Sequence, residues 1–155
     1  MYNQSGNNYP MDSLDRAIIN ELTRNGRISN QDLAHAVGLT PAPCLRRVRR
    51  LEEAGIIEGY SARINYEAMD EGFEVLVFAD LSRNDIASVQ DFEATIMASD
   101  KVVEFRRMYG LPDYYIKVRV KDSEAYERWY SEVAAKHDFI IRIDSRITMK
   151  LLKAP

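Results

Sequence analysis

The chain has 155 residues, of which 46% are hydrophobic, so it can form one medium-sized domain or two small ones with apolar cores. No apolar run approaches the roughly 20 residues that a membrane-spanning helix needs, so we expect no membrane partner. The single cysteine excludes an internal disulfide, and without a secretory signal sequence we expect a cytoplasmic protein.

Charge is distributed unevenly along the chain. The net charge is −3: residues 12–63 carry eight basic and seven acidic side chains, whereas residues 64–155 carry 13 basic and 17 acidic ones, a net −4 (13 − 17). The densest group of cations is the run RRVRR at residues 46–50. Because nucleic-acid binding follows local clustering of charge more than its sum, we expect DNA contacts from this run and none from the second half.

The first predicted helix follows a polar tail. Met1–Met11 has no charge, is rich in Asn, Gln, Ser and Gly, and is expected to be disordered. A helix is predicted over Leu14–Asn25, because apolar side chains recur at four-residue steps, namely Leu14, Ile18 and Leu22.

A shorter helix comes next. Ser29 is its expected N-cap, with an acid three residues on, close to a capping box. Gly38 ends it by supplying the left-handed conformation that a helix C-terminus favours. Its inner face carries Leu33, Ala34 and Val37. A helix, a glycine turn and another helix at this spacing indicate a helix-turn-helix.

The third helix, Thr40–Ala54, is the predicted recognition helix. Thr40 is expected to cap it through its hydroxyl group, and Pro41 fits the first helical position, where a missing N–H costs nothing. Steps of about 100° per residue place Cys44, Val48 and Leu51 on one face, with four arginines outward or to one side. A small, proline-fixed start and a basic outer face fit the DNA major groove. On this segment alone, a solvated helix with its arginines paired to acids is the alternative. The expected DNA-binding residues are Ser29, Asn30, Thr40, Ala42, Arg46, Arg47, Arg49 and Arg50.

A strand and a linker are predicted between the two halves. Ile56–Ile64 is too short and too rich in β-formers for a helix, so it is predicted as a strand that leaves the first domain. The predicted division is a helix-turn-helix domain over residues 12–59, a strand and linker over 60–72, and a second domain over 73–153.

The second half alternates between strand and helix patterns. Strands are predicted over Phe73–Leu81, Val102–Tyr109, Tyr114–Val120 and Phe139–Lys150, and helices over Asp85–Ser99 and from Ser123 to about Lys136. The order β-α-β-β-α-β is the ferredoxin-like arrangement, so the expected fold class is α+β. Phe73–Leu81 is apolar on both faces, and one layer of helices cannot cover both, which predicts that this strand lies in a subunit interface.

Catalytic and metal-binding motifs are absent from the sequence. His35 and His137 lie far apart, and neither stands in a ligand pattern with cysteine or acid, so both are expected to be surface residues. No phosphate-binding glycine loop occurs. We therefore expect neither an enzyme nor a metal or cofactor site.

Two stretches resemble a known family. SLDRAIINELTRNGRISNQDLAHAVGLTPAPCLRRVRRLEEAGIIEGY is similar to the N-terminal domain of the leucine-responsive regulatory protein/asparagine regulator (Lrp/AsnC) family, and GLPDYYIKVRVKD resembles its glycine-x-x-aspartate turn and following strand. The resemblance covers about Asp12 to Lys153. It implies a winged-type helix-turn-helix joined to a ferredoxin-like RAM (regulation of amino-acid metabolism) domain. It also implies homodimers that pair through their sheets and assemble into octamers, with a small amino acid bound between dimers near that turn.

The turn itself has suitable chemistry. Gly110 permits a backbone conformation or a close approach that a side chain would block, and Pro112 removes one donor. Free amides nearby can hold a carboxylate, while Asp113 can accept a hydrogen bond from an ammonium group. The alternative is ordinary hairpin chemistry, with Asp113 bonded only to its own turn. The expected effector-binding residues are Met108, Tyr109, Gly110, Leu111, Pro112 and Asp113.

Three functions follow as hypotheses. The first is a sequence-specific transcription regulator that binds double-stranded DNA and responds to an amino acid; the resemblance implies leucine, another branched-chain amino acid or methionine. The second is an effector-independent architectural protein that wraps DNA. The third is an enzyme built on the ferredoxin-like half, which lacks a nucleophile–base pair. An amino acid that changes DNA affinity or oligomer size separates the first two.

Overall fold

The computed structural model describes residues 9–82 and 85–152. The chain divides into two compact units, residues 1–63 and 64–155, and each is described by itself. Most of the expected disordered tail, Met1–Met11, lies outside the described residues, as does Lys153 at the predicted end of the second domain. Among the described residues, none of the helices has both the length and the apolar character needed to cross a membrane.

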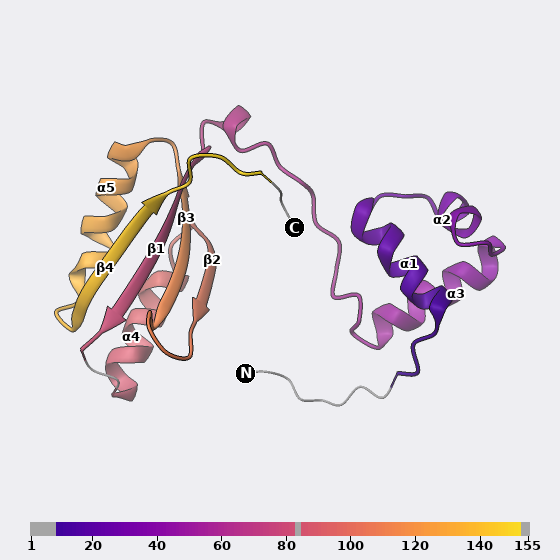
Figure 1. Ribbon diagram of the computed structural model, residues 1–155, viewed down its shortest axis with the longest axis horizontal. Helices are drawn as coiled ribbons and strands as arrows, with labels where there is room; N and C mark the ends of the chain where they lie inside the picture. The colour runs from indigo at the N-terminus through magenta and orange to yellow at the C-terminus, as the bar shows by residue number, and fades with distance from the viewer. Residues whose placement is uncertain (1–8, 83–84, 153–155) are drawn as a thin grey trace. The chain divides into compact units, whose positions relative to one another are not determined.

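Three helices form the first unit (Figure 1): α1 (Ser13–Arg24), α2 (Asn30–Ala36) and α3 (Pro41–Glu53). Asp12 caps α1 in a reciprocal capping box, and Ser29 caps α2 by accepting the Asp32 amide. The helices pack around the buried side chains Ile18, Leu33, Ala34, Cys44, Val48 and Leu51. All three helices begin and end within two residues of the predicted bounds.

The turn between α2 and α3 requires its glycine. Gly38 has φ of +71°, and the amide after it, on Leu39, donates to the Ala34 carbonyl over 2.8 Å. Such a left-handed residue followed by a backward hydrogen bond ends a helix. The chain then enters α3 directly, as the helix-turn-helix prediction requires.

The predicted strand at Ile56–Ile64 is wrong, because no strand forms there. Ile56 and Ile57 instead pack against the helical core, and their amides both donate to the Leu51 carbonyl at the end of α3. No strand lies beside this segment in the described chain, so its backbone forms no strand pairing. Its apolar side chains pack against the helices instead. Tyr60 is tied back by a 2.8 Å hydrogen bond to Glu52.

The second unit is a four-stranded antiparallel sheet with both helices on one face (Figure 1). A 3-10 turn, η1 (Glu67–Met69), precedes it. The elements are β1 (Phe73–Leu81), α4 (Ile86–Met97), β2 (Val102–Arg107), β3 (Tyr114–Val120), α5 (Ser123–Glu132), the 3-10 turn η2 (Ala134–Lys136) and β4 (Ile140–Ile147). The strand order β2-β3-β1-β4 confirms the predicted β-α-β-β-α-β fold.

The core lies between the sheet and its helices. Alternate side chains of β1 and β3 are buried, as predicted: Val75, Val77, Ala79 and Leu81 on one strand, and Tyr114, Ile116, Val118 and Val120 on the other. Val89, Phe92 and Ile96 of α4 and Trp129 of α5 cover them. This packing fixes which face of each strand remains open.

Ile86 shares the helical spacing of the buried Val89, Phe92 and Ile96, but it is 75% exposed because it is the first residue of α4, at the end of the helix. Two local predictions need correction. The helix predicted from Ser123 to about Lys136 is capped by Asp122 and ends at Glu132, where η2 follows. His137 is no surface residue: its side chain is 7% exposed, and its Nδ1 lies 3.2 Å from an Asp91 oxygen.

The other face of the sheet is open. Its centre holds Leu76, Phe78 and Tyr115, all partly buried, with the Phe78 and Tyr115 rings 5.6 Å apart. Ion pairs surround this apolar centre, for example Lys117 with Glu104 at 3.3 Å. The predicted second apolar face of β1 is therefore present.

Candidate functional site

The α3 helix has two distinct faces. Cys44, Val48 and Leu51 are buried, whereas Ala42, Arg46, Arg49 and Arg50 are exposed on the opposite face. Across the described chain, no ion pair joins Arg46 or Arg49 to an acid. These guanidinium groups therefore carry uncompensated charge on one surface.

The start of α3 differs from the prediction in one respect. Thr40 is the N-cap residue, but its side chain makes no capping hydrogen bond. Instead the Asn30 amide group donates to the Pro41 carbonyl over 2.8 Å, which ties the start of α2 to the first turn of α3. Ser29 is occupied at the start of α2, where its hydroxyl group also donates to Asp32. Of the two N-cap residues at this junction, Ser29 and Thr40, only Ser29 therefore caps its helix through the hydroxyl group.

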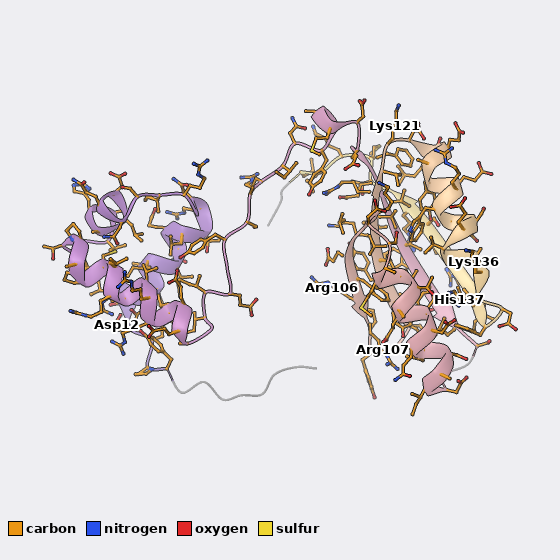
Figure 2. The ribbon with its side chains drawn as sticks, turned by 180° about the vertical axis from the view of Figure 1, so that it is seen from behind. Asp12, Arg106, Arg107, Lys121, Lys136 and His137 are labelled. Atoms are coloured by element: carbon orange, nitrogen blue, oxygen red, sulfur yellow. The ribbon has the colours of Figure 1, made fainter. Side chains whose placement is uncertain are left out.

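Arg47 is placed differently from the other arginines. One of its terminal nitrogens lies 2.7 Å from Asp15 and 2.8 Å from Asp12, at the start of α1. Asp15 is the buried charge of this unit, with 1% of its surface exposed. The Asp15 amide and then Arg47 hold the pKa of the Asp12 carboxyl below its usual value, and the bond to Asp15 raises the pKa of Arg47. Figure 2 labels Asp12 at this junction.

The predicted effector turn joins β2 and β3. Gly110 has φ of +99°, which favours glycine, but nothing lies within 4 Å of where its Cβ would be. Its conformation rather than a close approach therefore explains the glycine. Tyr109 is fully exposed and Leu111 is 83% exposed.

Asp113 is held by the sheet. Its carboxylate accepts the Leu81 amide over 2.8 Å, at the end of β1, and its carbonyl accepts the Met108 amide over 2.7 Å. The Asp113 carboxylate is therefore bonded to the neighbouring strand β1, whereas ordinary hairpin chemistry would bond it only to its own turn. One carboxylate oxygen, Oδ1, is not used in that bond.

A pocket of about 260 Å³ lies beside this turn, on the open face of the sheet. Leu111 and Pro112 form one wall, and the other lining residues are Phe78, Asp80, Arg142, Asp144 and Arg146. The sequence did not point to these five. Strand pairing brings them together, because Phe78 lies opposite Asp144 and Asp80 opposite Arg142 in the β1–β4 register.

The pocket combines both signs of charge with an apolar surface. The Asp144 carboxylate lies 2.7 Å from Arg146 and 3.8 Å from Arg142, and the bond from Arg146 lowers its pKa. The Arg146 guanidinium stacks 4.9 Å from the centre of the Phe78 ring. Cations, carboxylates and an apolar wall within one small volume are complementary to the carboxylate, ammonium group and side chain of an amino acid.

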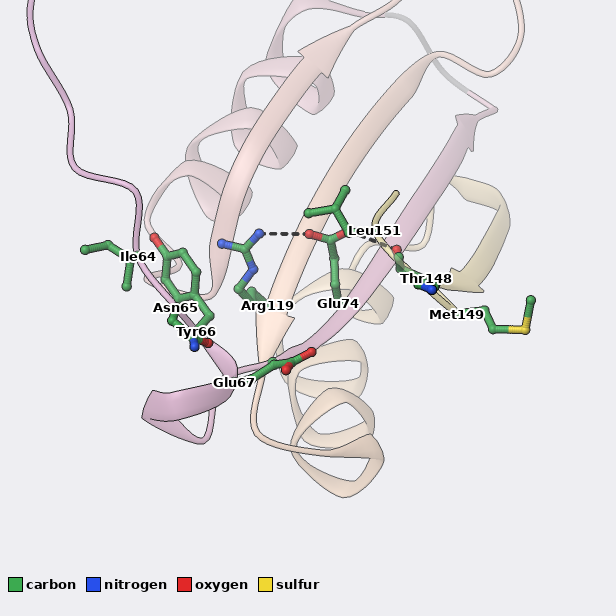
Figure 3. Close-up of a pocket in the computed structure, with 11 residues that line it drawn as sticks. Ile64, Asn65, Tyr66, Glu67, Glu74, Arg119, Thr148, Met149 and Leu151 are labelled. Atoms are coloured by element: carbon green, nitrogen blue, oxygen red, sulfur yellow. Dashed lines mark hydrogen bonds and ion pairs between the residues drawn. The ribbon is translucent and has the colours of Figure 1, made fainter. Parts of the chain in front are cut away.

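A second pocket, of about 250 Å³, lies at the other end of β1 (Figure 3). Glu74 accepts hydrogen bonds of 2.9 Å from both Arg119 and Thr148, and Arg119 stacks 4.0 Å from the centre of the Tyr66 ring. Burial raises the pKa of Glu74, but these two donors outweigh burial and leave it below its usual value. Both oxygens of Glu74 already have partners, so this pocket offers a ligand less unsatisfied polarity.

A metal site is not formed by residues 9–82 and 85–152. Within them, no three side chains of His, Cys, Asp or Glu are close enough to hold a metal ion. Cys44 is buried, and burial raises the pKa of its thiol, which fits packing rather than reactivity.

Comparison with known proteins matches both halves. Residues 11–58 match the winged helix-turn-helix DNA-binding family, and residues 74–155 match the Lrp/AsnC ligand binding domain. A leucine-responsive regulatory protein of Haemophilus influenzae is 43% identical over 121 residues, which span 78% of this chain and 73% of that protein. The Escherichia coli K12 protein of the same name is 40% identical over 79% of this chain and 74% of its own length.

Solved structures match over most of the chain. A transcriptional regulator from Neisseria meningitidis, crystallised as an L-Met complex, has a TM-score of 0.87 and 28% identity, covering 93% of both chains. An AsnC family regulator from Agrobacterium tumefaciens has a TM-score of 0.86 and 33% identity, covering 93% of this chain and 94% of its own. These matches confirm the predicted fold class and a regulator rather than an enzyme, and the chain belongs to the Lrp/AsnC family of DNA-binding transcription regulators.

Proposed function

We propose that this regulator binds specific DNA sequences through the outer face of α3 and that a small amino acid controls its DNA binding or assembly. The DNA surface consists of Thr40, Ala42, Arg46, Arg49 and Arg50. In a helix-turn-helix, the N-terminal part of the recognition helix meets the base edges, and arginines along it contact guanine or phosphate. Uncompensated charge on Arg46 and Arg49 supports this assignment.

Arg47, Ser29 and Asn30 are not part of the proposed surface. Arg47 is paired with two carboxylates, and Ser29 and Asn30 make the hydrogen bonds that hold α2 and its junction with α3. We therefore propose structural roles for these three residues.

The amino-acid site is proposed for the pocket beside the β2–β3 turn, and the observation that carries it is the mixture of Arg142, Arg146 and Asp144 with an apolar wall. The guanidinium groups would bind the α-carboxylate, and the carboxylates would bind the ammonium group. Phe78, with Leu111 from the turn, would contact the side chain. An apolar wall favours leucine, another branched-chain amino acid or methionine over a charged effector. The L-Met complex of the Neisseria relative supports this class of ligand.

Assembly is proposed to use the open face of the sheet. Leu76, Phe78 and Tyr115 form an apolar centre that the two helices of the same chain do not cover. Pairing of two such faces gives a homodimer, and the exposed turn residues Tyr109 and Leu111 provide apolar surface for dimers to assemble further, to an octamer. A ligand beside the turn would then bind at the margin of these contacts.

A thermal-shift screen of the twenty amino acids tests the proposed site. A ligand that binds only the folded protein raises its melting temperature by mass action. We expect one apolar amino acid to raise it in the wild type and not in Arg142→Ala. Arg128→Ala is the matched control, because Arg128 lies on α5 and pairs with Glu124. No shift with any amino acid would instead favour the architectural, effector-independent function.

A further inference from the structure

We propose that Arg47 is a positioning residue, which sets the orientation of the recognition helix through Asp12 and Asp15 and makes no contact with DNA. This inference rests on the proposed DNA surface of α3. Arg47 lies in the middle of that helix, whereas its two partners lie 35 and 32 residues earlier, at the start of α1.

Arg47, Asp12 and Asp15 form a cluster, here called the clamp, in which every carboxylate oxygen accepts a hydrogen bond. Asp15 accepts Arg47 through Oδ1 over 2.7 Å and the Asp12 amide through Oδ2 over 3.2 Å. Asp12 accepts the Asp15 amide over 2.9 Å and Arg47 over 2.8 Å. The clamp therefore joins the capping box of α1 to α3, and rotation of α3 about its own axis would break it. That rotation decides where Arg46 and Arg49 point.

The charge of the clamp argues against a phosphate contact. One guanidinium group and two carboxylates leave a net charge of −1 around Arg47, so this point on the surface repels a phosphate rather than attracting it. The Arg47 side chain is also only 24% exposed. Arg46 and Arg49, by contrast, carry no such compensation in the described part of the chain.

Tyr9 extends the same cluster toward the DNA surface. Its hydroxyl group lies 3.5 Å from Asp15, and the Arg50 guanidinium stacks 5.3 Å from the centre of its ring. Asp12 and Asp15 at the start of α1 thus hold Arg47 by charge, and Tyr9, which precedes that helix, contacts Arg50 by stacking.

A double variant separates positioning from contact. Arg47→Met alone leaves Asp15 buried without its cation, and we expect a lower melting temperature and weaker binding to a duplex that the full-length wild type has selected from a random pool. Arg47→Met/Asp15→Asn removes both charges, while asparagine keeps an acceptor for the Asp12 amide. We expect it to recover folding, because no buried charge is left unpaired, and to bind that duplex roughly tenfold more weakly than the wild type, because the clamp that orients α3 is gone. An affinity equal to that of the wild type would show that the clamp does not set the orientation of α3.

The salt dependence decides the role, measured at a temperature where circular dichroism shows each variant to be folded. We expect the slope of log affinity against log salt to stay unchanged in the double variant, whereas the loss of a phosphate contact lowers it by about one. A folded double variant with weakened binding and a lower slope would overturn the proposal and make Arg47 a DNA contact. A double variant that does not recover folding would also overturn it, because the clamp would then not explain the destabilisation. If Arg49→Ala in parallel left the slope unchanged, the proposed surface itself would fail.

Discussion

Replacement of Arg49 by alanine should weaken DNA binding by an amount that depends on salt. Arg49 projects from the exposed face of α3, and no acid in the described chain neutralises it. Each neutralised phosphate contributes a slope of about −0.9 to log affinity against log salt. Between 50 and 200 mM salt, log salt rises by about 0.6, so one lost contact reduces the salt-induced fall in affinity by about 3.5-fold. Two symmetry-related contacts in a dimer give about 12-fold.

Fluorescence anisotropy with a labelled selected duplex measures this slope at four or five salt concentrations. Arg24→Ala is the matched control, since it also removes one positive charge, but from α1, where Arg24 pairs with Glu21 at 3.1 Å. Its slope should equal that of the wild type. If Arg49→Ala and Arg24→Ala gave the same slope as the wild type, the outer face of α3 would not contact phosphate.

Other consequences concern the second unit. Asp113→Ala should cost about 1–2 kcal/mol of stability in denaturant unfolding, because the Leu81 amide loses a charged acceptor. It should also weaken the amino-acid response while DNA binding persists, because that bond holds the turn whose Leu111 and Pro112 line the pocket; an unaltered response would show that the turn does not position the site. Leu76→Glu places a charge in the open sheet face and should yield monomers in sedimentation, whereas Ile86→Glu, on an exposed helix end, should not. Glu74 has a depressed pKa in the folded state, so its stabilisation is present above its unfolded pKa and is lost as pH falls through the folded value. Glu74→Gln should therefore flatten the loss of stability below about pH 4, and an unchanged acid titration would contradict this.

Periodicity in the sequence was enough for most of the fold. The alternation in Phe73–Leu81 and Tyr114–Val120 identified both central strands to the residue, because burial on one face leaves a pattern of period two. The same composition misled at Ile56–Ile64, where apolar side chains pack on helices instead of joining a sheet. Strand propensity reports a preference for half-buried surfaces, and only the tertiary structure decides whether a partner strand is available.

The residues of the candidate sites were likewise predictable from the sequence only in part. The outward arginines follow from helix geometry alone, since they oppose Cys44 and Leu51. The partners of Arg47 were not predictable, because Asp12 and Asp15 are far away in sequence and meet it only through helix packing. The pocket beside the turn likewise depends on strand register: a shift of one residue would turn its charged side chains to the other face.

One titration bears on the proposed regulation as a whole. The full-length protein is titrated with its selected duplex at fixed salt, alone and with each of the twenty amino acids, and oligomer size is followed in parallel by sedimentation. We expect leucine, another branched-chain amino acid or methionine to change the Kd for DNA or the oligomer size, with a coupling of about fivefold or more in affinity. Equal Kd values and equal oligomer size with all twenty would contradict amino-acid control and leave a DNA-binding protein without this effector.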